Sequence, residues 1–456
     1  MAGVGFSLRK LSGGTTYAGM IRLYASAGVI SSGPWLISIL TLVLVGALGR
    51  ELAPSSDAVE RFQVSVTWLF ATSLLLTTPL QLLFTRHVSD LLYGEHDELA
   101  TPSMWGALCV VSVLVGIVCA FAWQLFGAET LALKLVLATC LEVLCATWIV
   151  IVMLTSLREH GQVVLAFALG YAVTLGATLL LAPYGELGLL SGFLLGQAVL
   201  LLWSLRVVVK LAPGAPSMAW GFFDPSRVHL DLLPIGLCYG FGIWADKLVF
   251  WLDDEVSRQV LGPFRASEVY DFPLFLAYLA ITPGMAAFLL QVETDYAERH
   301  TRFFKAVEEG GNLLKLERLR DELVDAARAA IVTILKVQGV TFAFCLVFGE
   351  TFLSWFGISR LHLPLFYVDV AAVSMQVLML SVISILFYLD RRTAVLWIAL
   401  LLAVSNTALT LASLRTGALF YGYGFAIAAS LTTLVALAVL TRAFRDVLRD
   451  TFMMQA

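Results

Sequence analysis

The chain has 456 residues, of which 59% are hydrophobic and only 14% are Asp, Glu, Lys or Arg. A soluble domain usually carries about a quarter charged residues, so this chain lacks the polar side chains that would cover a water-facing surface. The formal net charge of -4 gives no electrostatic basis for nucleic-acid binding. The composition favours a protein whose outer surface faces lipid.

Twelve runs of mainly apolar residues follow one another along the chain, each long enough to cross about 30 Å of hydrocarbon as a helix. The predicted fold class is therefore an all-α polytopic membrane protein of about twelve transmembrane helices. The predicted spans are 22–48, 62–84, 104–126, 131–155, 162–182, 187–209, 230–252, 268–290, 331–355, 364–388, 393–414 and 418–440.

The distribution of Lys and Arg predicts the orientation of these spans. With the N-terminus in the cytoplasm, twenty Lys and Arg residues fall on the cytoplasmic side and six on the opposite side. Cytoplasmic loops of membrane proteins carry such an excess. Both termini are thus predicted to be cytoplasmic, as an N-terminal segment at 1–21 and a tail at 441–456.

The two halves of the chain share short matches in the same order, which predicts an internal repeat. The first six-helix lobe covers 22–210, a cytoplasmic linker rich in Pro and Gly covers 211–229, and the second lobe covers 230–440. Two such lobes have the same orientation, so a pseudo-twofold axis runs along the membrane normal with a cavity between them. The matches are Gly33-x-Trp35 with Gly242-x-Trp244 at an offset of 209, Thr78-Pro79 with Thr282-Pro283 at 204, and Tyr184-Gly185 with Tyr421-Gly422 at 237.

The segment 291–330, inserted in the second lobe, is dense in charge of both signs and is predicted to be a cytoplasmic helical hairpin. Gly310-Gly311-Asn312 divides it into two helices. The second helix carries an apolar stripe that includes Leu316, Leu319 and Leu323. The stripe fits either a helix lying against the bundle or membrane, or a docking site for a cytoplasmic partner.

The chain lacks the common sequence motifs of nucleotide-binding and metal-dependent enzymes. It has no GxxxxGK[ST] phosphate loop, no HExxH pair and no Gly-rich dinucleotide motif after a strand. The six cysteines lie in apolar runs and form no CxxC pair. The sequence therefore predicts no metal, no cofactor and no enzymatic activity.

Three ionisable residues within the spans are candidates for a transport site. Asp246 and Lys247 lie in the outer part of the seventh span, and Glu142 lies midway along the fourth. A charge at a helix centre costs about 2.5–3.5 kcal/mol on insertion, so such residues usually face a cavity or a partner. The alternative for Asp246 and Lys247 is an ion pair that locks packing, and for Glu142 it is a protonated carboxyl group.

Aromatic and helix-breaking residues add further candidates. Trp35, Tyr239 and Trp244 are suited to stacking on a saccharide, although anchoring or packing explains them as well. Gly28, Gly33 and Pro34 loosen and kink the first span, while Pro79 and Pro283 lie at matching places in the second and eighth. These positions fit either moving, substrate-facing helices or static kinks.

Three stretches carry a resemblance to a known family. M-A-G-V-G-F-x-L-R-K-L at the start, Y-A-S-A-G-V-I-S-S-G-P-W in the first span and F-Y-L-D-R-R at 387–392 resemble the PelG family of inner-membrane Pel polysaccharide exporters. This family is similar to other branches of the multidrug/oligosaccharidyl-lipid/polysaccharide exporter superfamily, with two six-helix lobes around a cavity.

The resemblance implies a cargo and partners. The cargo is a nascent polymer rich in N-acetylgalactosamine, passed from the cytoplasm to the periplasm for a biofilm matrix. The partners are a PelF-like cytoplasmic glycosyltransferase and PelD-like and PelE-like membrane proteins.

Three hypotheses for the function follow. The first is a polysaccharide transporter of the bacterial inner membrane, driven by chain elongation or by an ion gradient. The second is a cation-coupled antiporter for small molecules, with Asp246 or Glu142 as its ion site. The third is a membrane scaffold that assembles a polysaccharide synthase without transporting anything.

Overall fold

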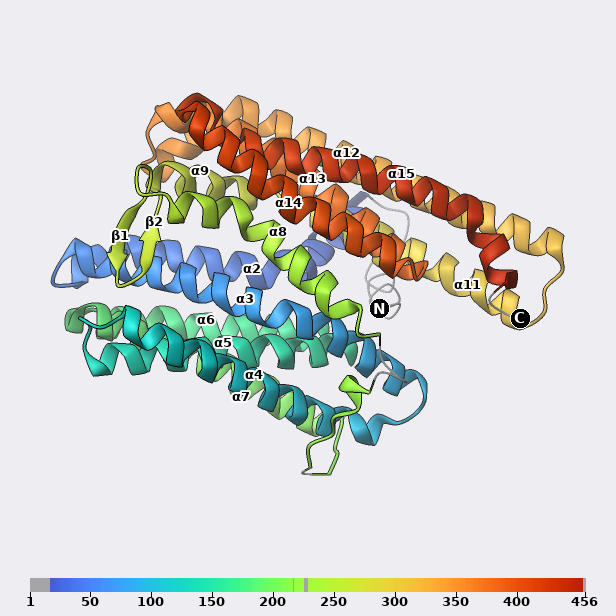
Figure 1. The fold of residues 1–456 in the computed structure, drawn as a ribbon, viewed down its shortest axis with the longest axis horizontal. Helices are drawn as coiled ribbons and strands as arrows, with labels where there is room; N and C mark the ends of the chain where they lie inside the picture. The colour runs from blue at the N-terminus through green and yellow to red at the C-terminus, as the bar shows by residue number, and fades with distance from the viewer. Residues whose placement is uncertain (1–16, 216, 225–228, 454–456) are drawn as a thin grey trace. The chain divides into compact units, whose positions relative to one another are not determined.

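The computed structural model describes residues 17–215, 217–224 and 229–453, and within these residues the fold is helical apart from one β-hairpin (Figure 1). The predicted segment 1–21 lies largely outside the described residues. The main elements are α2 (Tyr17–Leu52), α3 (Ser56–Tyr93), α4 (Ala100–Leu125), α5 (Leu131–Ser156), α6 (His160–Leu181), α7 (Gly185–Leu211), α8 (Leu232–Leu252), β1 (Arg258–Leu261), β2 (Phe264–Ala266), α9 (Glu268–Leu279), α10 (Thr282–Leu290), the π-helical turn η4 (Gln291–Tyr296), α11 (Ala297–Glu308), α12 (Leu313–Trp355), α13 (Leu363–Tyr388), α14 (Arg392–Thr416) and α15 (Tyr423–Met453).

Eleven helical stretches of the described chain are long and apolar enough to cross a membrane. One of them, His160–Leu211, has 52 residues and contains both α6 and α7. Three close approaches show that these two helices are antiparallel: Gly170 to Leu200, Thr174 to Gly196, and Thr178 to Gly192. They are therefore separate spans, which confirms the all-α fold of about twelve spanning helices.

The chain divides into two compact units. The C-terminal unit comprises the chain up to Ser32, the segment Ala245–Phe250 and the chain from Glu268 onward; the N-terminal unit comprises Gly33–Trp244 and Trp251–Ser267. The units differ from the predicted lobes because α2 and α8 are each divided between them. The division of α2 and the first division of α8 fall at the matched Gly-x-Trp motifs, and α8 changes unit again between Phe250 and Trp251. The lobe boundaries at 22–210 and 230–440 stay a prediction.

The helix pairs α6–α7 and α14–α15 share one packing feature. A Cβ on Gly192 would lie 2.4 Å from the backbone of Thr178, and a Cβ on Gly424 would lie 2.5 Å from the backbone of Thr410. Small residues let membrane helices approach this closely. The two glycines and the two threonines each differ by 232 positions, so this contact repeats at an offset of 232 and not at the 237 suggested by the Tyr-Gly pairs.

The proline positions are less alike than the sequence suggests. Pro34 and Pro79 lie inside the continuous helices α2 and α3. Pro283 instead lies in the first turn of α10, after a break at Ala280 and Ile281. Pro is tolerated in a first turn because the N–H it lacks has no helical acceptor there. The predicted eighth span is therefore two helices that meet just before Pro283, whereas α3 runs unbroken through Pro79, and a hinge role for either proline stays a prediction.

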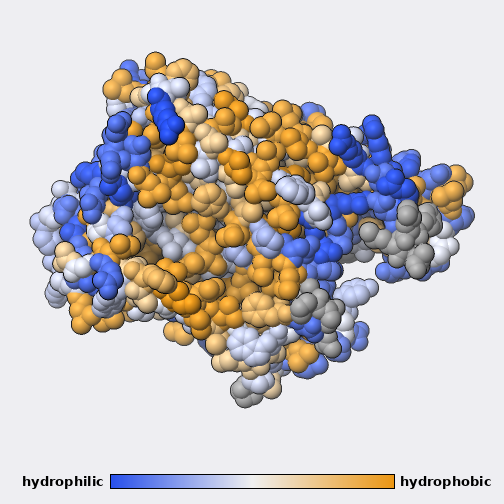
Figure 2. Space-filling model, viewed as in Figure 1, coloured by the Kyte–Doolittle hydropathy of each residue, from blue (hydrophilic) through white to orange (hydrophobic). Residues whose placement is uncertain are grey.

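The segment 291–330 forms a hairpin that extends two spans. Its break is confirmed: Gly310 has φ 70°, and the Asn312 side chain accepts a hydrogen bond from the Lys315 N–H at 2.8 Å. The hairpin is continuous with the membrane helices, because α12 runs unbroken to Trp355 and η4 joins α10 to α11. Figure 2 shows hydrophilic residues gathering on this hairpin and apolar ones along the middle of α14 and α15.

The apolar stripe of this hairpin points inward. Leu316 and Leu323 are buried where α12 packs on α11, and Leu319 is half-buried. The prediction that Leu316 and Leu323 dock a partner is wrong, because they close the hairpin itself. Leu313 and Leu314 at the tip are 57% and 78% exposed instead.

The predicted tail 441–456 continues the last span, because α15 runs unbroken to Met453, with Val447 buried and Arg391 paired with Asp450. Its position in the cytoplasm stays a prediction. In the N-terminal unit, β1 and β2 form an antiparallel hairpin that the sequence analysis missed. The indole N–H of Trp68 donates to the Arg265 carbonyl at 2.7 Å and its ring stacks on Phe264, which fastens this hairpin to α3.

Candidate functional site

A buried network of polar side chains lies inside the C-terminal unit. Four helices supply it, so residues far apart in the sequence meet in one place. Its members are Asp246 and Lys247 of α8, Tyr270 and Tyr278 of α9, Asp369 and Gln376 of α13, and Asn406 and Thr410 of α14.

The Asp246 carboxylate is fully buried and accepts hydrogen bonds from three side chains. The Tyr270 hydroxyl donates to Oδ2 at 2.7 Å, the Asn406 amide donates to Oδ1 at 3.2 Å, and Lys247 Nζ lies 3.2 Å from both oxygens. A buried carboxylate is tolerated when it is paired and hydrogen-bonded in this way. Asp246 thus has its counter-ion within the chain.

Lys247 is held by further contacts beside this carboxylate. Its ammonium group donates to the Tyr278 hydroxyl at 3.1 Å and lies 5.0 Å from the Tyr278 ring centroid and 5.4 Å from that of Phe425. Tyr278 in turn donates to Gln376 Oε1 at 3.2 Å. Rings at these distances attract a cation through their negative faces. This geometry is that of an ion pair tied to neighbouring helices, and a transport role for the pair stays a proposal.

Asp369 is a member of this cluster that the sequence analysis missed. It is fully buried in α13, and neither of its carboxylate oxygens has a hydrogen-bond partner. Gly422, with φ 82°, leaves room for it, because a Cβ there would lie 2.8 Å from Asp369 Oδ1. An isolated buried carboxylate is costly as an anion, so Asp369 is suited to binding a proton or a small cation. The sequence signal that could have identified Asp369 is its position inside the apolar run of the tenth predicted span.

A second buried cluster lies at the base of the α11–α12 hairpin, where it joins the C-terminal unit. The Tyr388 hydroxyl donates to Glu293 Oε2 at 2.9 Å, and His300 Nε2 lies 2.8 Å from the Tyr388 carbonyl oxygen. Glu293 belongs to η4, and π-helical turns occur often at functional sites. These bonds join the root of the hairpin to the end of α13.

The other transport candidates belong to the N-terminal unit. Glu142 of α5 is half-buried and accepts a hydrogen bond from Ser112 of α4 at 2.6 Å.

The aromatic candidates Trp35, Tyr239 and Trp244 are half-buried too. The Trp244 ring packs at a tilt against Trp251, with ring centroids 6.1 Å apart. The Trp244 contact is one of packing, and saccharide stacking on the three aromatics stays a prediction.

The hinge candidates of α2 and α3 lie at helix contacts or at the division of α2 between the units. A Cβ on Gly28 would lie 3.8 Å from the Ala286 Cβ, close to an apolar cluster that α2 and α10 form. Gly33 and Pro34 are the first residues of α2 in the N-terminal unit. In the same unit, Gly236 of α8 lies against Pro79, because a Cβ on Gly236 would be 2.6 Å from the Pro79 Cα.

No group of three or more His, Cys, Asp or Glu side chains within the described residues is placed to hold a metal ion. All six cysteines are free thiols. Among the described residues, the buried charged side chains Asp246, Lys247, Glu293 and Asp369 all belong to the two clusters of the C-terminal unit.

Comparison with known proteins adds a family and a fold. The family model "PelG: Putative exopolysaccharide Exporter (EPS-E)" matches residues 1–452. No curated protein sequence matches the chain.

Several solved structures of transporters are similar to this chain. An outward-facing multidrug resistance MATE family transporter of the MOP superfamily has a TM-score of 0.67 and 13% identity, covering 93% of this chain and 96% of that one. An inward-facing MATE family transporter has a TM-score of 0.59 and 15% identity, covering 91% and 96%. A MOP superfamily transporter from Pyrococcus furiosus has a TM-score of 0.61 and 16% identity, covering 92% and 96%. At these identities the likeness shows the fold.

Proposed function

Because the chain belongs to the PelG family of exopolysaccharide exporters, we propose that it moves a nascent exopolysaccharide across the bacterial inner membrane, from the cytoplasm to the periplasm. The observation that carries the proposal is the match of this family over 1–452, joined to a fold shared with MOP superfamily transporters. The cargo is a Pel-like polymer rich in N-acetylgalactosamine, destined for a biofilm matrix.

The proposal assigns conformational change to helices α2 and α8. Each is divided between the two compact units, and the division of α2 falls at Gly33 and Pro34. A proline inside a helix removes one backbone hydrogen bond and loosens the helix there. Similar solved transporters are described as outward-facing and inward-facing, so the fold accommodates both states.

In this proposal the α11–α12 hairpin couples export to synthesis by docking a PelF-like glycosyltransferase, alongside PelD-like and PelE-like membrane proteins. The exposed Leu313 and Leu314 at its tip supply the apolar contact that Leu316 and Leu323 cannot. The bonds from Glu293 and His300 to Tyr388 then tie the docked hairpin to α13.

The experiment uses cells that lack their own copy of this protein and express the full chain with its synthase. The double variant Leu313→Ser/Leu314→Ser is expected to lower both the co-purified glycosyltransferase and the secreted polymer, with unchanged amounts of exporter in the membrane. Leu211→Ser, another exposed leucine at the same predicted membrane face, is the matched control. Polymer secretion in the absence of the chain would disprove export, and wild-type secretion and complex formation by the double variant would disprove docking.

A second candidate, cation-coupled transport, is favoured by Asp369 specifically. Asp246 already has Lys247 as counter-ion, and Glu142 is hydrogen-bonded, whereas the Asp369 oxygens are unpartnered. Proteoliposomes containing the chain alone would then show small-molecule efflux that needs a proton or sodium gradient and is lost in Asp369→Asn. Polymer export that needs the synthase, with no gradient-driven flux by the chain alone, would exclude this candidate.

A further inference from the structure

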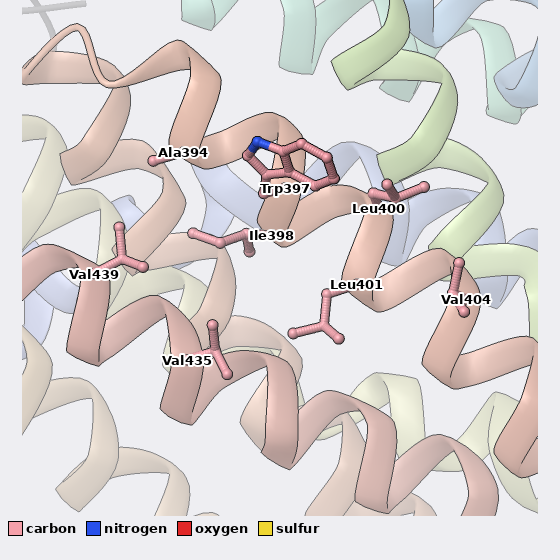
Figure 3. Close-up of a pocket in the computed structure, with 8 residues that line it drawn as sticks. All are labelled: Ala394, Trp397, Ile398, Leu400, Leu401, Val404, Val435 and Val439. Carbon is pink, nitrogen blue, oxygen red and sulfur yellow. The ribbon is translucent and has the colours of Figure 1, made fainter.

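The surface of the C-terminal unit has a shallow apolar groove between α14 and α15. Its volume is about 590 Å³. Figure 3 shows Val435 and Val439 of α15 opposite Ile398 and Leu401 of α14, with the Trp397 indole nitrogen on the side of Ala394. The lining is formed by Ala394, Trp397, Ile398, Leu400, Leu401, Val404, Val435 and Val439.

Two arginines extend the α15 side of this groove beyond its apolar part. Arg442 follows Val435 by two helical turns and so lies on the same face, about 4.5 Å along the axis from Val439. Arg445 follows one turn later. Both side chains are exposed, at the helix end that the Lys and Arg distribution assigns to the cytoplasm.

The charges around these arginines leave a positive surplus. Arg391 pairs with Asp450, Arg392 with Asp390, and Arg449 with Asp446 and Asp450. Within the described residues, Arg442 and Arg445 form no ion pair. The groove thus ends at two positive charges that no acidic side chain of the described chain neutralises.

We propose that this groove and the two arginines bind an anionic phospholipid of the inner leaflet, with an acyl chain against Val435 and Leu401 and the phosphate on Arg442 and Arg445. Basic residues beside membrane helices attract anionic lipid headgroups. Bulky aliphatic side chains line the groove, whereas contacts between membrane helices use small or polar residues. The lining therefore fits an acyl chain better than the helix of another protein. This site goes beyond the export function and does not depend on it.

Native mass spectrometry of the full chain in detergent tests the site, with phosphatidylglycerol and phosphatidylcholine titrated separately. The wild type is expected to bind phosphatidylglycerol at least threefold more tightly than phosphatidylcholine. Arg442→Gln/Arg445→Gln is expected to abolish this preference, and Arg442→Lys/Arg445→Lys to keep most of it. Arg415→Gln, which removes an exposed charge at the opposite end of α14, is the matched control and is expected to have no effect.

A groove-filling variant, Val435→Trp, tests the acyl-chain contact without altering charge. It is expected to weaken phosphatidylglycerol binding at least twofold, with an unchanged thermal unfolding midpoint. No lipid preference in the wild type, an equal loss in Arg415→Gln, or full binding by Val435→Trp would each overturn the site. A membrane protein co-purifying on this face, lost in Val435→Trp, would overturn the choice of a lipid as occupant.

Discussion

The helix pairs α6–α7 and α14–α15 use the same close contact but carry different chemistry. In both, a glycine lies against a threonine backbone, at Gly192 and Thr178 in one and at Gly424 and Thr410 in the other. In α14 the neighbouring Asn406 donates a hydrogen bond to Asp246. Its counterpart at the same offset, Thr174, donates to the Gly170 carbonyl of its own helix. The Gly–Thr packing contact is therefore repeated in the two units, whereas the hydrogen bond to a buried carboxylate occurs in the C-terminal unit.

The largest expected effect is the stability cost of removing a carboxyl group, which should be greater in the C-terminal unit than in the N-terminal unit. Asp246→Ala leaves the Lys247 ammonium buried without its counter-ion, which costs about 3–5 kcal/mol. Glu142→Ala in the N-terminal unit removes a half-buried carboxyl with one hydrogen bond and is expected to cost about 1 kcal/mol. Thermal unfolding in detergent measures both.

The double variant Asp246→Ala/Lys247→Met serves as the control, because it removes both charges together. It is expected to regain most of the stability lost in Asp246→Ala. Equal losses in Asp246→Ala and Glu142→Ala would show that the two units do not differ in this respect. Normal polymer secretion by a stable charge-free variant would favour the scaffold hypothesis over transport.

The next prediction tests the shared contact. Gly192→Ala and Gly424→Ala each place a methyl group about where the partner backbone lies, and each is expected to cost about 1–3 kcal/mol. Gly176→Ala, in the partner helix α6, meets nothing within 4 Å and is the control expected to be neutral or stabilising. If only one of the two glycine variants is destabilised, the packing repeat at an offset of 232 is wrong.

The last prediction compares the counterparts Asn406 and Thr174, and Thr174→Val has the smallest expected effect. Asn406→Thr makes α14 resemble α6 and removes a hydrogen bond to a carboxylate, at a cost of about 1.5–3 kcal/mol. Thr174→Val removes the bond to the Gly170 carbonyl of its own helix and the acceptor of the Gln197 amide at 3.5 Å, and is expected to cost about 1 kcal/mol. Unfolding midpoints of the two purified variants, compared with wild type, give the ranking. The reverse order would mean that Asn406 does not support Asp246.

The sequence predicted those parts of the fold that depend on local composition. Apolar runs identified the twelve spans, and Gly310-Gly311-Asn312 identified the turn of the hairpin. The sequence also pointed to Asp246 and Lys247, because burial of charge can be inferred wherever an ionisable residue interrupts an apolar run. It did not reveal their partners, since Asn406 is 160 residues from Asp246 along the chain.

The errors in the sequence-based predictions arose where the outcome depended on distant contacts. The stripe at Leu316 and Leu323 was correctly identified as apolar, but only the packing of α12 on α11 decided that it faces inward. Asp369 was missed because nothing next to it in the sequence shows that its carboxylate lacks a partner.

By itself, the sequence determined that this protein is a helical membrane protein of about twelve spans, because helix length and hydropathy are local properties that a bilayer selects directly. Its family, too, is a property of the sequence. Only the tertiary structure decided that α2 and α8 are each divided between two units, and that Asp246 has Lys247 as counter-ion while Asp369 has no partner. Those features depend on which helices meet, and side chains on several helices together determine that.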